Sequence, residues 1–86
     1  MKHASHPAIS KRLKRAEGHL RAIIAMMADG RSCLDLAQQL HAVESAVANA
    51  KRELIHDHIE HCLDAPESAL SGKGALKELK AITKYL

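Results

Sequence analysis

Aromatic side chains are almost absent from this sequence. Its 86 residues include no Trp and no Phe, and the one Tyr is Tyr85. The apolar content is therefore Ala, Leu, Ile, Val and Met, which suits packing between helices far better than a β-sandwich. A core built without large side chains is marginal for a lone chain of this length and favours self-association.

Long apolar runs are missing as well. The longest unbroken run, Ala22–Ala28, has seven residues, whereas a helix that spans a membrane needs about 20. The first letters, MKHASHP, lack the apolar stretch of a secretory signal, so we expect a cytoplasmic protein without a membrane partner. In that reducing compartment Cys33 and Cys62 are better explained as metal ligands or reactive thiols than as a structural disulfide.

Acidic residues are scarce in the first third of the chain. Residues 1–31 hold seven Lys or Arg and two Asp or Glu, a net charge of +5. Residues 32–86 hold six Lys or Arg and eight Asp or Glu, a net charge of −2. A basic front half on an otherwise acidic body points to a polyanionic partner, most simply nucleic acid.

Apolar residues recur at alternating intervals of four and three along two stretches, as is typical of amphipathic helices. The first stretch is Ile9, Leu13, Ala16, Leu20, Ile23 and Met27, and the second is Leu36, Leu40, Val43, Val47, Ala50 and Leu54, continuing to Leu63. Gly30 is a natural terminator for the first helix, and Ser32 with Asp35 reads as a capping box that starts the second.

The end of the chain predicts one more helix. Pro66 breaks the second helix, and the segment SALSGKG (68–74) is expected to be a loop. A last helix follows with Leu76, Leu79, Ile82 and Leu86 on one side. The whole chain, residues 1–86, is therefore predicted to be a single all-α domain of three helices. The first two form an antiparallel hairpin, because the turn between them is short.

The spacing of the possible metal ligands requires a second chain. His58 and Cys62 are four residues apart and share one face of a helix. Cys33 would lie about 43 Å from Cys62 along a continuous helix, far beyond a metal–sulfur distance near ~2.3 Å. An antiparallel pairing of the second helix with that of another copy brings Cys33 of one chain beside His58 and Cys62 of the other. We therefore predict a dimer, a four-helix bundle, with two equivalent sites.

The donor set restricts the ion. Two sulfurs and an imidazole suit three-coordinate Cu(I), and a fourth ligand would suit Ni(II), Co(II) or Zn(II). His3 and His6 lie on a predicted flexible N-terminal arm, residues 1–6, and either could supply that ligand. The remaining histidines are better explained as packing or surface residues: His19, His41, His56 and His61.

The first helix carries most of the basic residues. Those predicted to contact DNA are Lys11, Arg12, Lys14, Arg15 and Arg21. They fall mostly opposite the apolar stripe and could neutralise several phosphates, which makes binding strongly dependent on salt. No helix-turn-helix or zinc-finger pattern is present, so a flat basic surface built from several chains is the simpler geometry.

Three segments together resemble the CsoR/RcnR family of metal-sensing transcriptional repressors: RLKRAEGHLRAI (12–23), CLDLAQQLHAVESAV (33–47) and HDHIEHCL (56–63). The resemblance implies an all-helical dimer that pairs into a tetramer, binds operator DNA when metal-free and releases it when metal binds. The resemblance also implies that Cys33, His58 and Cys62 are the metal ligands, and that Glu78 is an acidic partner next to the metal site. Ser32 and His19 depart from the family pattern, which often has Tyr and Gln at these positions.

Other readings remain open. A repressor that senses thiol oxidation or persulfide would use Cys33 and Cys62 without needing His58. Glu53 and His56 form a Glu-x-x-His pair like that of di-iron bundles, which requires Glu53 to face the core. A structural adaptor would leave the Cys and His placement unexplained. We expect a repressor and not an enzyme.

Overall fold

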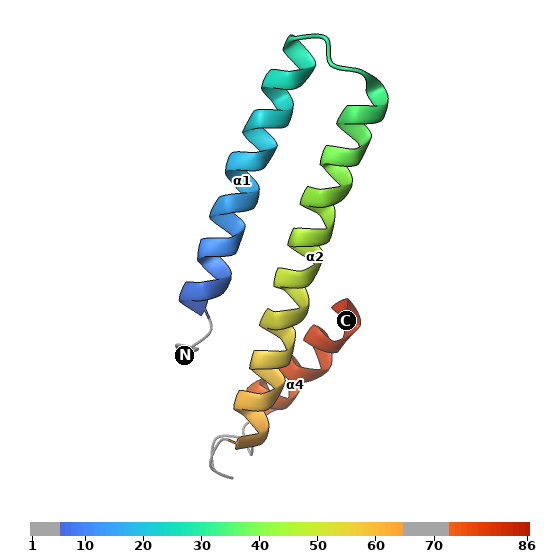
Figure 1. Cartoon of the computed structure of the whole chain (residues 1–86). Helices are drawn as coiled ribbons and strands as arrows, with labels where there is room; N and C mark the ends of the chain where they lie inside the picture. The colour runs from blue at the N-terminus through green and yellow to red at the C-terminus, as the bar shows by residue number, and fades with distance from the viewer. Residues whose placement is uncertain (1–5, 65–72) are drawn as a thin grey trace.

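The computed structural model describes residues 6–64 and 73–86, and this part of the chain is helical. Helix α1 spans His6–Ala28, α2 spans Cys33–Asp64 and α4 spans Lys73–Ile82, followed by a 3₁₀ turn, Thr83–Tyr85. Helices α1 and α2 lie side by side as an antiparallel hairpin, and α4 turns back beside the far end of α2 (Figure 1). The predicted all-α fold is confirmed.

The turn between α1 and α2 follows the local rules that the sequence suggested. Gly30 adopts a φ of 73°, a conformation that costs other residues about 1–2 kcal/mol. The N–H of Arg31 donates to the carbonyl of Met26 (3.1 Å), and that of Gly30 donates to the carbonyl of Met27 (3.2 Å). This pair of bonds is the Schellman motif, which satisfies the last carbonyls of α1.

The core of the hairpin is one narrow row of side chains from each helix. The buried apolar residues are Ile9, Ala16 and Ile23 from α1 and Val43, Ala50 and Ile55 from α2. On α1 the buried residues are seven apart, as in the seam of a coiled coil. Ile23 and Ile55 are almost fully enclosed, so they contribute most to the packing of this small core.

A second apolar row on each helix remains half-exposed. These residues keep 37–44% of their surface exposed: Leu13, Leu20, Leu40, Val47 and Leu54. They form one flank of the hairpin, which we call the apolar flank. Between its two rows lies a groove of about 290 Å³ lined by Ile9, Leu13, Val47, Ala50, Lys51 and Leu54.

The C-terminal part differs from the sequence prediction at both ends. Lys73 and Gly74 were expected to be in a loop but form the first residues of α4, and the break expected at Pro66 lies outside the described residues. Leu86 was expected on the apolar side of the helix. It lies beyond the 3₁₀ turn and is 63% exposed, because the helix tightens at Thr83, whose hydroxyl donates to the carbonyl of Lys80.

Among the described helices, none has the length and apolar character needed to cross a bilayer.

Candidate metal centre

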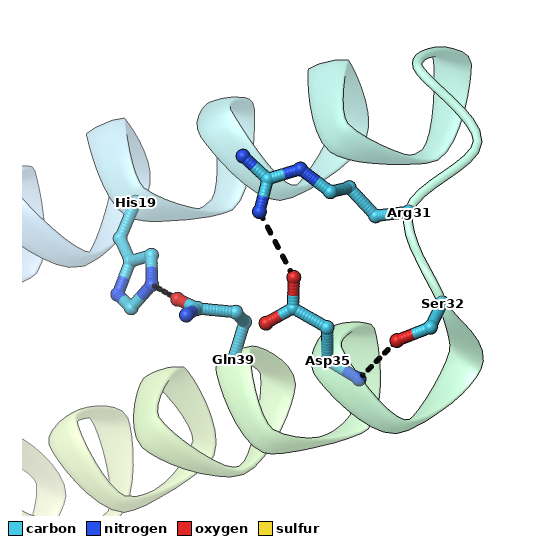
Figure 2. Close-up of polar contacts among 5 residues, drawn as sticks. All are labelled: His19, Arg31, Ser32, Asp35 and Gln39. Atoms are coloured by element: carbon cyan, nitrogen blue, oxygen red, sulfur yellow. Dashed lines mark hydrogen bonds and ion pairs between the residues drawn. The ribbon is translucent and has the colours of Figure 1, made fainter.

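Cys33 is the first residue of α2 and its side chain is exposed. The backbone N–H of Asp35 donates to Ser32 Oγ (3.1 Å), which is the helix cap that the sequence predicted. The Asp35 carboxylate in turn accepts a hydrogen bond from Arg31 Nη1 (3.0 Å), as Figure 2 shows. Cys33 therefore sits on a turn held by a cap and an ion pair, with its thiol open to a partner.

His58 lies near the other end of α2 and is the one buried polar side chain in the described residues, with 9% of its surface exposed. Its Nε2 is 4.0 Å from Glu78 Oε1 of α4. Burial restricts the ring to few orientations, and a nearby carboxylate is the usual partner of an imidazole that binds metal. This is the position that the family resemblance assigned to Glu78.

Cys62 is in the last turn of α2, one turn beyond His58. Its side chain lies outside the described part of the structure. The 32-residue length of α2 shows that the helix runs without a break from Cys33 past Cys62, so about 43 Å separates the two cysteines along its axis. Within one chain, the described residues contain no group of three His, Cys, Asp or Glu that could hold a metal ion.

The remaining predicted ligands are at the start of the chain. His6 is exposed and is the first residue of α1, so the predicted flexible arm, residues 1–6, was wrong at His6. His3 lies outside the described residues. His41, His56 and His61 are exposed. Whether any of these, or Cys33, His58 and Cys62, binds an ion remains a prediction.

The residues predicted to contact DNA are all exposed. Arg21 pairs with Glu17 one turn before it in α1 (3.4 Å). Arg12 Nη1 pairs instead with Glu53 Oε1 of α2, across the hairpin. Glu53 thus faces solvent and Arg12. The di-iron interpretation required Glu53 to face the core, so the structure contradicts it.

Sequence reasoning missed a second polar contact between the helices. His19 Nε2 lies 2.6 Å from Gln39 Oε1, and the pair is partly buried between α1 and α2 (Figure 2). The two residues are 20 positions apart, so no local pattern could pair them. The departure from the family pattern at His19 was the one available signal.

The chain belongs to the metal-sensitive transcriptional repressors, because the profile of the family described as "Metal-sensitive transcriptional repressor" matches residues 5–85. The copper-sensing transcriptional repressor CsoR of Mycobacterium ulcerans (strain Agy99) is 39% identical over 74 residues, which cover 86% of this chain and 63% of that protein. CsoR of Bacillus subtilis (strain 168) is 37% identical over 76 residues, covering 88% of this chain and 75% of the relative. This chain therefore spans just under two thirds of the Mycobacterium ulcerans protein.

A solved structure is similar along the whole chain. The nickel-responsive transcriptional regulator InrS matches with a TM-score of 0.77 at 29% identity, over 100% of this chain and 98% of that chain. The family resemblance seen in the sequence is thus confirmed. The expectation that the chain is not an enzyme is confirmed too, because its relatives are transcriptional repressors.

Proposed function

We propose that this chain is a cytoplasmic, single-domain repressor that binds double-stranded operator DNA when metal-free and releases it when a transition metal ion binds. The ligands are Cys33 of one chain and His58 and Cys62 of another. The family and its copper- and nickel-responsive relatives support the class of function. The proposed ligand set and dimer rest on the residues of this chain alone.

The observation that carries the proposal is a shared centre of symmetry on α2. In an antiparallel pair of α2 helices, bringing Cys33 level with the His58–Cys62 dyad places the two-fold axis near residues 46–47. The exposed apolar row on α2 is Leu40, Val47 and Leu54, and its middle residue is Val47. The ligand spacing and the uncovered apolar surface therefore both support a symmetric dimer with Val47 near its two-fold axis.

The donor set fits a soft or borderline ion. His58 offers an enclosed imidazole with a carboxylate at 4.0 Å, and Cys33 offers an accessible sulfur at a fixed helix start. Two thiolates and this imidazole suit Cu(I), and His3 or His6 as a fourth ligand suits Ni(II), Co(II) or Zn(II). Copper-sensing and nickel-responsive proteins both stand among the relatives, so we keep both ions.

The proposed mechanism is linkage between two sites. Ligands from two chains hold one ion, so binding favours the arrangement of the two α2 helices in which Cys33 and His58 are closest. The buried core joins α1 to α2 within each hairpin. A shift of α2 therefore also shifts the basic residues of α1. A coupling of about 1–3 kcal/mol changes DNA affinity about 5–150-fold, and DNA must weaken metal binding by the same factor.

The test is a titration of metal against a labelled operator duplex with the full-length protein. Cu(I) and Ni(II) are added separately, and affinity for DNA is followed by fluorescence anisotropy. We expect at least one ion to weaken binding about fivefold or more. An affinity that no transition metal changes would contradict the proposal. Absorption spectra of His3→Ala and His6→Ala then decide the ion: a planar Ni(II) spectrum that needs either histidine indicates nickel, and an unaffected Cu(I) complex indicates copper.

A repressor that senses thiol oxidation is the second candidate. The exposed sulfur of Cys33 is compatible with it. It gives no role to the enclosed His58 beside Glu78, and for that reason we prefer the metal sensor.

A further inference from the structure

The hairpin has a polar flank opposite the apolar flank, and two contacts between helices mark its ends. Arg12 pairs with Glu53 at one end, and His19 bonds to Gln39 at the other. On α2 the residues 39, 46 and 53 are seven apart, so they share one face of the helix. On α1, Arg12 and His19 are also seven apart. The two contacts therefore lie along one line between α1 and α2.

A hollow of about 300 Å³ lies on this flank. It is lined by Arg12, Arg15, Ala16, His19, Ala46 and Asn49. Its volume is roughly ten times the space of one water molecule. Ala16 and Ala46 are the small residues of the lining, and a longer side chain at either position would fill the space. The hollow is therefore open because two of its lining residues are alanines, and its rim is formed by polar side chains.

The rim is cationic and rich in hydrogen-bond donors. Arg12 and Arg15 each carry a guanidinium, which binds the oxygens of a phosphate through paired N–H donors. Asn49 Oδ1 accepts a hydrogen bond from Arg52 Nη2 (2.6 Å), which leaves the amide N–H groups of Asn49 as its donors and adds a third guanidinium nearby. These groups are complementary to one phosphate group.

Among the residues that the structure describes, Glu53 is the acidic residue that pairs with this rim, through Arg12. Both side chains of the pair are about half-exposed, so the pair is open to water and contributes little to stability. A phosphate that enters the hollow offers Arg12 a second anionic partner. The carboxylate of Glu53 therefore competes with the phosphate for Arg12.

We propose that this hollow binds one backbone phosphate of DNA and that Glu53 weakens the binding by competing for Arg12. The inference rests on the proposed function, because it assigns a contact to the DNA-binding face. A phosphate contact carries no sequence information, so operator and mixed-sequence duplexes use the hollow alike. The logarithm of the DNA-binding constant falls linearly with the logarithm of salt concentration, and removing one phosphate contact makes this slope about 0.9 less steep. Near ~0.1 M salt the change corresponds to a loss of about tenfold in affinity.

The test uses the metal-free full-length protein and a mixed-sequence duplex, with anisotropy titrations over a series of salt concentrations. Ala46→Leu adds no charge but fills the hollow, so we expect about tenfold weaker binding and a salt slope reduced by about 1. The matched control is Ala37→Leu, an exposed position on the opposite face of α2, and we expect it to bind as the wild type does. We expect Glu53→Gln to bind several-fold more tightly.

Three results would overturn the inference. One is an Ala46→Leu protein whose affinity and slope match those of Ala37→Leu. Another is Glu53→Gln binding no more tightly than the wild type. The third is an Ala46→Leu protein that loses binding of inorganic phosphate, followed by NMR, yet binds DNA normally, because the hollow would then serve a small phosphorylated ligand. Should Ala46→Leu fail to fold by circular dichroism, or fail to form the wild-type oligomer by light scattering, Arg15→Gln takes its place with the same expected loss.

Failure of the inference is distinguishable from failure of the proposed function. A wild-type protein that binds the duplex and releases its operator on metal addition, together with an unaffected Ala46→Leu, shows a repressor whose phosphate contacts lie elsewhere. A wild-type protein that binds no duplex contradicts both.

Discussion

His58 Nε2 and Glu78 Oε1 are 4.0 Å apart, and this contact joins the far end of α2 to α4. The imidazole is enclosed, whereas 68% of the Glu78 side chain is exposed. The carboxylate can therefore adjust while the ring stays fixed. In the proposed metal site the fixed ring is the ligand, and Glu78 is the carboxylate partner of its imidazole.

We expect Glu78→Gln to weaken metal binding about 10–100-fold with the stoichiometry unchanged, because the ring loses the charged partner that orients it. Competition against a chromophoric chelator measures the affinity. Glu60→Gln is the matched control, since it removes an exposed carboxylate of the same end of α2. An equal loss in both variants would mean that Glu78 acts only through its charge at a distance.

His58→Ala separates the metal sensor from the thiol sensor. We expect the variant to bind DNA with wild-type affinity and to lose its response to metal, because the two thiolates alone make an incomplete site. DNA affinity with and without metal, measured by anisotropy, gives the answer. A variant that keeps its full response would favour a switch made from Cys33 and Cys62.

Val47→Glu tests the dimer. Val47 is at the centre of the exposed apolar row on α2 and is 44% exposed, so in the proposed dimer its substitution puts two like charges near the two-fold axis. We expect the protein to become monomeric by light scattering and to lose tight metal binding together with the partner's ligands. Ser45→Glu, an exposed position on another face of α2, should stay oligomeric. A Val47→Glu protein that stays dimeric and binds metal would contradict an interface centred on Val47.

Two glycines should respond to alanine with opposite signs. At Gly30, with φ of 73°, a Cβ meets nothing within 4 Å, so the cost is backbone strain alone, and we expect about 1–2 kcal/mol of destabilisation. Gly18 is inside α1 with the same open surroundings, and alanine there should stabilise by up to about 1 kcal/mol. Denaturant unfolding at one fixed protein concentration measures both changes. Equal effects at the two positions would contradict the left-handed turn.

The helices could be predicted because their signals are local. The four-three spacing, Gly30 and the Ser32 cap each act within a few residues, and the structure agrees with them. The start of α4 was missed because Lys73 and Gly74 carry no capping signal of their own. Gly74 is also a poor helix former.

The contacts between helices could not be predicted from local rules. Arg12 and Glu53 are 41 residues apart, and whether they meet depends on how far each helix is rotated about its axis. The amphipathic stripe sets that rotation only coarsely. The spacing of His58 and Cys62 did indicate the ligand pair, but the burial of His58 beside Glu78 required the position of α4.

The central claim, that one metal site is shared between two chains, is tested most directly by mixing two defective chains. Cys33→Ala lacks one ligand, and the double variant His58→Ala, Cys62→Ala lacks the other two, so neither should bind metal tightly alone. Mixed and refolded together in equal amounts, half of the dimers are hybrids with one complete site each, and we predict about a quarter of wild-type metal loading. A mixture that loads no more metal than its separate components would contradict the claim.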